Sequence, residues 1–193
     1  DAVNCAPKEF IFTGGGSEAN NLVLWNMIHR DRKHVITSAI EHPAILAVLR
    51  QLEHLGITHT IIPVNKYGWV NPDDIDAAIR DDTGLITIML ANNEVGTVEP
   101  LQDIAKIAKK HDVLFHSDGI QVMGKLPIDV QELGMDMMSF SAHKFYGPKG
   151  VGALYIKEGI SMKPLIIGGS QEKSLRAGTE NVGGIAGLGC AAE

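Results

Sequence analysis

Short apolar runs alternate with longer amphipathic segments along most of the chain. The short runs are bounded by glycine, proline or polar residues, and they predict strands at 10–13, 34–38, 58–64, 85–90, 113–116, 135–140 and 151–156. The longer segments have helical spacing and predict helices at 17–30, 43–55, 72–80 and 101–111. Strands and helices that alternate in this way are typical of a mostly parallel sheet between two layers of helices. We therefore expect a three-layer αβα fold of the α/β class.

Composition narrows the class of protein. The 193 residues suit one domain, and the 45% hydrophobic content is sufficient for a core. The net charge of −6 gives no basic footprint for nucleic acid. No apolar run approaches the roughly 20 residues that cross a bilayer, and no signal peptide is visible. Cys5 and Cys190 lie near opposite ends of the chain, which excludes a disulfide framework and favours a reducing compartment such as the cytoplasm.

Three consecutive glycines, 14–16, follow the first predicted strand and precede a predicted helix that Ser17 can cap. In α/β sheets the ligand site lies beyond the carboxyl ends of the strands, and a helix N-terminus at that position attracts phosphate. The alternative is a tight connection with no ligand. The turn matches neither GxGxxG nor GxxxxGK[ST], so dinucleotide-binding and Walker-type interpretations lack support.

Lys144 lies just after the apolar run at 135–140, and the glycines and proline at 147–150 then turn the chain away. A lysine at the end of a buried strand is well placed for chemistry, because a desolvated amine can lose its proton and attack a carbonyl carbon to form a Schiff base. The alternative is that the side chain extends to the surface and stays charged.

Three other strand ends carry polar residues, namely Asp118, His42 and Asn93. Asp118 follows a buried strand, where it could pair with a protonated ring nitrogen or cap the next turn. His42 could stack on a flat cofactor or cap a helix, and Asn93 could contact a phenolic oxygen or its own turn. A Schiff-base lysine, a pyridinium partner and a phosphate cradle are together what pyridoxal 5'-phosphate (PLP) requires.

These residues belong to stretches that resemble the class V aminotransferase group of PLP enzymes, and above all the cysteine desulfurases of the NifS/IscS kind. The matching stretches are TGGGSEANN at 13–21, EH at 41–42, NNEVG at 92–96, HSD at 116–118 with Gln121 and GK at 124–125, SFSAHKFYGPKG at 139–150, GGSQE at 168–172 and RAGTEN at 176–181. The resemblance covers nearly the whole chain and implies the large domain of a fold type I PLP-dependent enzyme, similar to aspartate aminotransferase.

The resemblance implies catalytic roles for residues near the cofactor ring. Lys144 would form the Schiff base with PLP, and His143 would help to transfer protons. Asp118 would pair with the pyridine nitrogen, and His42 would stack on the ring and act as an acid or base. The remaining cofactor contacts implied are to the phenolic oxygen, from Gln121 or Asn93, and to the phosphate, from Gly16, Ser17, Ser141 and, in a neighbouring subunit, Thr179.

The activity implied is conversion of L-cysteine to L-alanine, with the sulfur passed to an acceptor thiol as a persulfide. A homodimer, a sulfur-acceptor or scaffold protein and a role in iron–sulfur cluster assembly would follow. We identify no metal site, and no nucleic-acid or membrane partner is implied.

The chain also departs from this group. It starts at Asp1, after the usual Asp-Asn-Ala-Ala-Thr segment, and ends at Glu193, before the small domain that carries a substrate-binding arginine and a persulfide cysteine. We therefore expect 1–193 to be a truncated large domain in which neither cysteine is catalytic. Alternatives are another class V aminotransferase, a selenocysteine lyase, or a non-catalytic fragment that binds PLP or dimerises.

Overall fold

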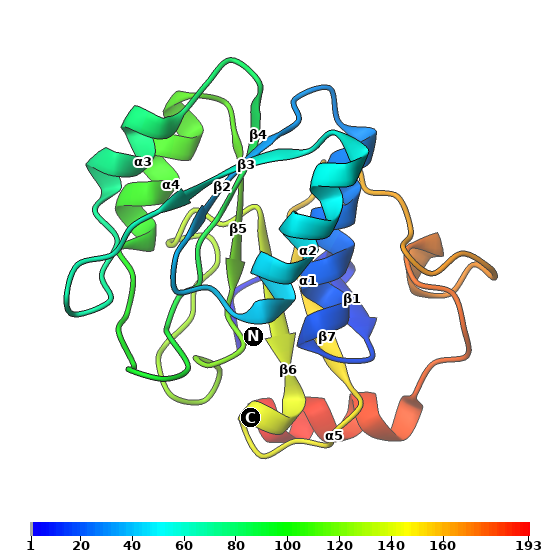
Figure 1. The fold of residues 1–193 in the computed structure, drawn as a ribbon. Coiled ribbons are helices and arrows are strands. Elements are labelled where there is room, and N and C mark those ends of the chain that lie inside the picture. The colour runs from blue at the N-terminus through cyan, green and yellow to red at the C-terminus, as the bar shows by residue number, and fades with distance from the viewer. Residues whose placement is uncertain (1) are drawn as a thin grey trace.

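One seven-stranded sheet forms the centre of the molecule in this computed structural model, which describes residues 2–193 (Figure 1). From edge to edge the strands follow the order β1-β7-β6-β5-β4-β2-β3. The bounds of the strands are Phe10–Thr13 for β1, His34–Ser38 for β2, Thr58–Ile62 for β3, Thr83–Thr87 for β4, Leu114–Asp118 for β5, Met137–Ser141 for β6 and Gly152–Ile156 for β7.

The strands from β2 to β6 are parallel, and β7 runs antiparallel to both of its neighbours. This confirms the expected mostly parallel sheet. Because parallel strands end at the same edge of a sheet, the carboxyl ends of β2, β4, β5 and β6 face one side of the molecule. The segment between β6 and β7 turns back at this edge, so that β7 begins where β6 ends.

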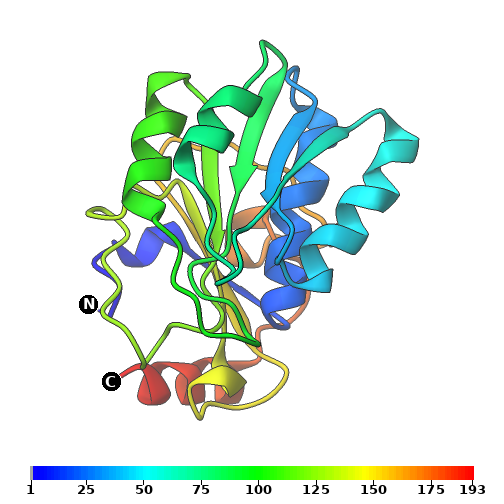
Figure 2. The same cartoon turned by 60° about the vertical axis from the view of Figure 1, so that its left-hand side comes forward.

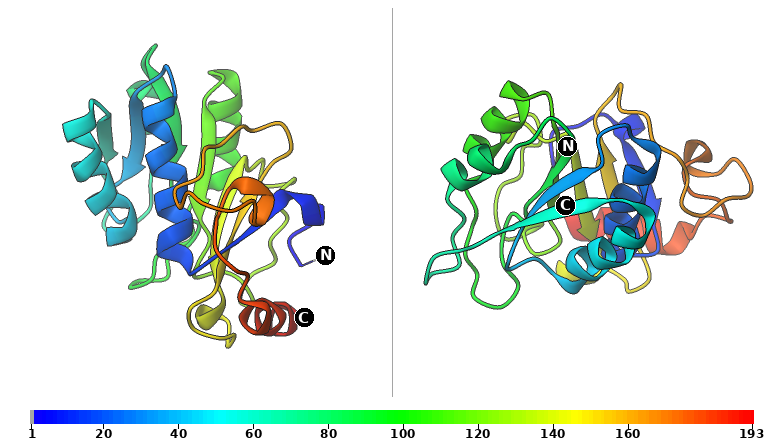
Figure 3. Two further views of the ribbon diagram at one scale, coloured as in Figure 1. Left: turned by 90° about the vertical axis from the view of Figure 1, so that its right-hand side faces the viewer. Right: turned by 45° about the horizontal axis from the view of Figure 1, so that its top comes forward.

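Helices cover both faces of the sheet, as expected for three layers (Figures 2 and 3). Helices α1 and α2 pack together over one face, and α3 and α4 pack together over the other. A fifth helix, α5, lies across the end of the sheet at which β6 stops (Figure 1). The bounds of the helices are Gly16–Trp25 for α1, Pro43–Leu52 for α2, Pro72–Ala78 for α3, Leu101–Lys110 for α4 and Val182–Ala192 for α5.

The central strands are buried on both faces, and successive side chains enter two different hydrophobic cores. Val35 and Leu85 pack in the core beneath α1 and α2, whereas Ile36 and Ile86 pack in the core beneath α3 and α4. This arrangement explains why the strands read as nearly continuous apolar runs rather than as alternating ones.

Two histidines lie inside the sheet and join neighbouring strands through hydroxyl groups. His116 of β5 is buried between the Thr87 Oγ1 atom of β4, 2.8 Å from its Nδ1, and the Ser139 Oγ atom of β6, 3.0 Å from its Nε2. Burial lowers the pKa of His116 to about 3, because the charged ring would lose its hydration. His34 of β2 contacts threonines of β3 and β4 in the same way, and burial lowers its pKa to about 4.

The structure differs from the sequence-based expectation mainly at the ends of elements. The helix predicted at 17–30 consists of α1 and a 3-10 turn, Asn26–His29, and the helix predicted at 43–55 ends in a similar turn. The strand predicted at 85–90 pairs regularly only as far as Thr87. Helix α5 was not predicted, because its four glycines are poor helix formers. Within residues 2–193, no helix is both long and apolar enough to span a membrane.

Gly152, the first residue of β7, lies directly against the glycine-rich turn after β1. A Cβ atom at this position would lie 2.6 Å from the carbonyl carbon of Gly15 and 2.6 Å from the carbonyl oxygen of Phe140. Both atoms belong to the backbone, so neither can move without shifting the turn or β6. The close approach therefore requires glycine.

Gly152→Ala is expected to destabilise the fold by about 1–3 kcal/mol, as overpacking of a well-packed site does. Chemical denaturation would measure the change in the free energy of unfolding. Gly183→Ala in α5 is the control, because a Cβ there meets no atom within 4 Å and should stabilise the helix by about 0.5–1 kcal/mol. Equal effects of the two substitutions would contradict the assigned close contact.

Candidate active site

A cavity of about 560 Å³ lies at the carboxyl ends of the parallel strands. Its lining comes from the turns that follow β1, β2, β4, β5 and β6. Nine of the ten residues predicted for the site line this cavity: Gly16, Ser17, His42, Asn93, Asp118, Gln121, Ser141, His143 and Lys144. Thr179 is exposed and does not line it. The structure thus brings the nine together, and their chemical roles stay predictions.

The glycine-rich turn places the N-terminus of α1 at the cavity. Gly15 precedes the helix with φ 153° and ψ 176°, a combination that essentially only glycine adopts. Gly16 packs so closely on the turn after β5 that a Cβ would lie 2.1 Å from the Ile120 Cδ1 atom. Ser17, which was expected to cap α1, is instead its second residue. Its N–H is therefore among the first helical donors, which have no acceptor within the helix and suit an anion.

Asp118 is a buried carboxylate on the cavity wall, with 3% of the residue exposed. Its Oδ2 atom accepts a hydrogen bond of 2.7 Å from Asn20 Nδ2, and its Oδ1 atom accepts one of 3.0 Å from the backbone N–H of Ile120. Burial raises the pKa of Asp118, and these two hydrogen bonds together with the field of His42 oppose that rise. The carboxylate has no ion-pair partner within residues 2–193, so a cation in the cavity would improve its environment.

Lys144 ends a 3-10 turn, Ala142–Lys144, directly after β6. The residue is exposed and lines the cavity. Of the two alternatives for this lysine, a desolvated amine and a side chain that extends to the surface, the chain alone shows the second, because the turn carries the side chain out of the sheet. His143 lies on the same turn, with its Nδ1 atom 3.0 Å from the Ser141 Oγ atom.

His42 both caps helix α2 and lines the cavity. The two interpretations of this residue, a helix cap and a contact to a flat cofactor, are therefore compatible. Its Nδ1 atom accepts a hydrogen bond of 3.0 Å from the backbone N–H of Ala44 in the first turn of α2. With Nδ1 as acceptor, the neutral ring carries its proton on Nε2. The cap therefore selects one tautomer and fixes the orientation of the ring.

Two neighbouring asparagines have different functions in the turn after β4. Asn92 holds the turn, because its Oδ1 atom accepts hydrogen bonds from the backbone N–H groups of Glu94 and Val95. Its Nδ2 atom donates to the carbonyl oxygen of Ile40, in the turn after β2. Asn93 is exposed and lines the cavity, so it is available to a ligand bound there.

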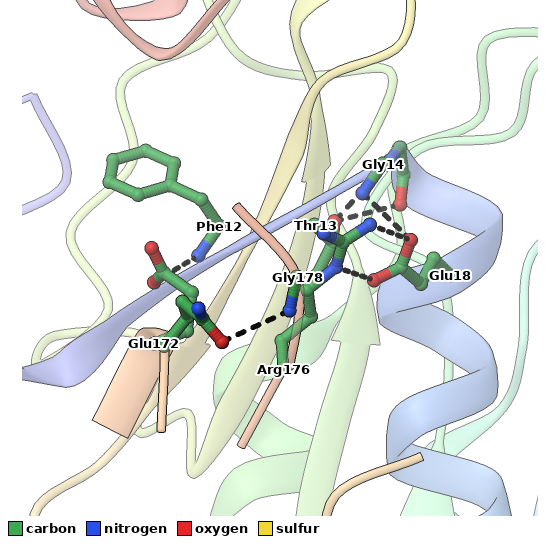
Figure 4. A network of polar contacts seen from close by, with 9 residues as sticks. Phe12, Thr13, Gly14, Glu18, Glu172, Arg176 and Gly178 are labelled. Atoms are coloured by element: carbon green, nitrogen blue, oxygen red, sulfur yellow. Dashed lines mark hydrogen bonds and ion pairs between the residues drawn. The ribbon is translucent and has the colours of Figure 1, made fainter. Parts of the chain in front are cut away.

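An ion pair anchors the glycine-rich turn to the segment that precedes α5 (Figure 4). The Glu18 Oε1 atom accepts a hydrogen bond of 2.9 Å from Arg176 Nε, and its Oε2 atom accepts one of 2.8 Å from the backbone N–H of Gly14. Glu172 adds a second attachment, since its carboxylate accepts the N–H of Phe12 at 2.9 Å. These contacts hold the segment before Thr179 against β1 and the turn.

Sequence reasoning did not identify several residues that shape the site. Asn20 lies on the buried side of α1 with Gly16 and Ala19, and a polar residue at that helical spacing was the available signal. Arg176 and Glu18 are 158 positions apart, so their pairing had no local signal. No group of three or more His, Cys, Asp or Glu side chains able to hold a metal ion occurs within residues 2–193.

Known proteins resemble this chain both in sequence and in fold. The family model described as "Aminotransferase class-V" matches residues 1–193. The chain belongs to the class-V aminotransferase family. One relative in it, "Cysteine desulfurase IscS" of Dictyoglomus turgidum, is 53% identical over 195 residues, which cover 100% of this chain and 50% of the relative.

Solved structures support the same placement within the class-V family. A "NIFS-LIKE PROTEIN" superposes with a TM-score of 0.96 at 40% identity, covering 99% of this chain and 54% of that one. A structure described as "SspA in complex with cysteine" superposes with a TM-score of 0.94 at 43% identity, covering 97% of this chain and 56% of that one. The chain thus spans about half the length of the proteins it matches.

Arg176→Met is expected to lower the free energy of unfolding by about 1–2 kcal/mol, because it removes charge-assisted hydrogen bonds from a largely buried carboxylate. It should also speed amide hydrogen exchange at Gly178, because the N–H of Gly178 donates to Gln171 Oε1 within the segment that Arg176 anchors. Lys106→Met is the matched control, since the pair of Lys106 with Asp103 is exposed and should contribute less than about 0.5 kcal/mol. If the two variants lost the same stability, the anchoring role would be wrong.

Proposed function

We propose that this chain is the PLP-binding large domain of a cysteine desulfurase, which converts L-cysteine to L-alanine and passes the sulfur to an acceptor thiol. The observation that carries the proposal is the presence of Lys144 and the buried Asp118 on one cavity beside a helix N-terminus. The name of the Dictyoglomus turgidum relative and the cysteine complex of SspA support the choice of substrate.

The residues present fit PLP in three respects. Asp118 is a buried carboxyl group without an ion-pair partner within residues 2–193, which suits a protonated ring nitrogen. The first N–H groups of α1, with Gly16, Ser17 and Ser141, suit the phosphate. Lys144 supplies a primary amine on the same cavity, and Asn93 or Gln121 supplies an amide for the phenolic oxygen. When bound, PLP supplies an aldehyde for attachment of an amine and a ring that withdraws electrons.

The protein groups would divide the work of the reaction between them. Lys144 would hold the cofactor and accept or return a proton once the substrate amine has replaced its own. Asp118 would keep the ring nitrogen protonated, which strengthens electron withdrawal. His42 would exchange a proton with the substrate through Nε2, the nitrogen that the cap on α2 does not use. His143 would assist proton transfer.

The rest of the assembly is proposed by the same reasoning. Thr179 is exposed on the segment held by Arg176, where it would reach the phosphate in the second subunit of a homodimer. A persulfide-forming cysteine and a protein that accepts the sulfur would complete the reaction, for example in iron–sulfur cluster assembly. The structure records Cys5 and Cys190 as free thiols, in keeping with the cytoplasm, and neither lines the cavity.

Lys144 is tested by chemical trapping. After incubation with PLP, borohydride reduction is expected to leave the cofactor covalently attached to the peptide that contains Lys144, as mass spectrometry would show. Lys144→Ala should abolish the attachment. Lys149→Ala is the matched control, because Lys149 lines the same cavity and should not be needed. Attachment that persists in Lys144→Ala and disappears in Lys149→Ala would overturn the assignment.

Asp118→Asn should slow exchange of the α-hydrogen of bound amino acids by well over tenfold, equivalent to more than about 1.4 kcal/mol in the barrier. The reason is that a neutral amide no longer stabilises the protonated ring nitrogen. NMR in deuterated water would measure the exchange rates of the two proteins. Equal rates would mean that the carboxylate only caps the turn at Ile120.

A further inference from the structure

Glu41 is a buried carboxyl group immediately before His42, with 5% of the residue exposed. Its Oε1 atom accepts hydrogen bonds of 2.6 Å from the Ser38 Oγ atom and 2.9 Å from the backbone N–H of Met89. Ser38 ends β2, and Met89 follows β4 and lines the cavity. Glu41 therefore ties together the two turns that present His42 and Met89 to the cavity.

The two oxygens of Glu41 have different surroundings. Oε1 accepts two hydrogen bonds, whereas Oε2 is buried and has no hydrogen-bond partner within residues 2–193. An ionised carboxylate would place half of its charge on a buried oxygen to which no protein group donates, which is costly. A protonated acid fits this arrangement better, because its carbonyl oxygen accepts both bonds and because an unpaired neutral hydroxyl at Oε2 costs less than an unpaired charge there.

The neighbouring acidic groups also favour the protonated form of Glu41. Asp118 of β5 and Glu99, just before α4, are also buried carboxyl groups, and both raise the pKa of Glu41. No lysine or arginine forms an ion pair with Glu41 in the described part of the chain, and the nearest basic group in sequence is the neighbouring His42. Burial is the largest cause, and together these effects raise the pKa of Glu41 to about 8, against the lowering by Ser38 and Met89.

We infer that Glu41 is a positioning residue that acts as a neutral, protonated acid and fixes the His42 turn against the strand end at Met89. Asp118, whose two oxygens both accept hydrogen bonds, is then the carboxyl group available to a cation in the cavity. A second negative charge at Glu41 would repel that of Asp118 and disturb its match with one cation in the cavity. The protonation of Glu41 is independent of any cofactor, whereas its positioning role rests on the proposed function.

The first test measures protonation and needs no cofactor. An infrared difference spectrum of wild type minus Glu41→Gln near neutral pH should show a carboxylic-acid carbonyl band. Glu99→Gln is the control, because Glu99 is also a buried glutamate with one carboxyl oxygen, Oε1, that lacks a hydrogen-bond partner within residues 2–193. A carboxylate band in the Glu41 difference spectrum, with the acid band lost only in Glu99→Gln, would overturn the proposal.

The second test uses the pH dependence of stability. A folded-state pKa near 8, above the unfolded value of 4.5, means that the folded protein retains a proton that the unfolded chain loses between these pH values. Wild type should therefore lose stability relative to Glu41→Gln as pH rises from about 4.5 to about 8, which melting temperatures would show. A difference that stays constant above pH 5 would mean that Glu41 is ionised. If Glu41→Gln does not fold, NMR of wild type with labelled glutamate carboxyls gives the same answer.

The third test addresses positioning in the protein loaded with PLP. Glu41→Ala removes the oxygen that accepts hydrogen bonds from Ser38 and Met89. The His42 turn beside the cofactor would then no longer be fixed, so the pH at which the visible absorption band of the cofactor changes should shift. Glu41→Gln keeps an acceptor without charge and should restore the wild-type value. A loss of melting temperature in Glu41→Ala with an unchanged band titration would reduce Glu41 to a structural residue. Absence of the band in wild type would instead contradict the proposed function and leave the first two tests valid.

Discussion

Five parallel strands end at one edge of the sheet, and the polar groups of the cavity depend on that edge for their positions. Burial of the strands on both faces fixes their register, because a slip of one residue would exchange the two cores. The same burial keeps water from the carboxyl group of Asp118 and from Glu41, at the ends of β5 and β2. The architecture therefore determines the electrostatics of the cavity as well as its shape.

Charge is distributed unevenly between the sheet and its edge. His34 and His116 lie within the sheet, and burial keeps both rings neutral at physiological pH while their hydrogen bonds join neighbouring strands. Lys144 and Glu18, by contrast, line the cavity at this edge. A ligand with both a phosphate and a cationic ring would find its complements at this edge, and the interior contributes rigidity rather than charge.

The sequence predicted the αβα fold and the strand ends at which Asp118, His42, Asn93 and Lys144 line the cavity, because both depend on local signals. The resemblance to a known family added residues such as Ser141 and Gln121. Apolar runs end where a buried strand ends, and polar residues placed there must face the edge of the sheet. Helix α5 was not predicted, because its glycines have low helix propensity. Tertiary packing outweighs that propensity, for example where Leu188 packs in the core. The partners of Asp118, Glu41 and Arg176 could not be inferred, because each pairing joins segments that only the order of the strands brings together.

The reversed direction of β7 has a consequence for the order in which the site assembles. Lys144 lies in a connection closed by the antiparallel pair Ser141 and Gly152, whose positions differ by 11. Asn20 and Asp118 are separated by 98 positions. Closing the longer loop costs about 2 kcal/mol more in chain entropy. The lysine loop can therefore close as a local event, whereas Asp118 acquires its hydrogen-bond partner only when α1 and the sheet have come together.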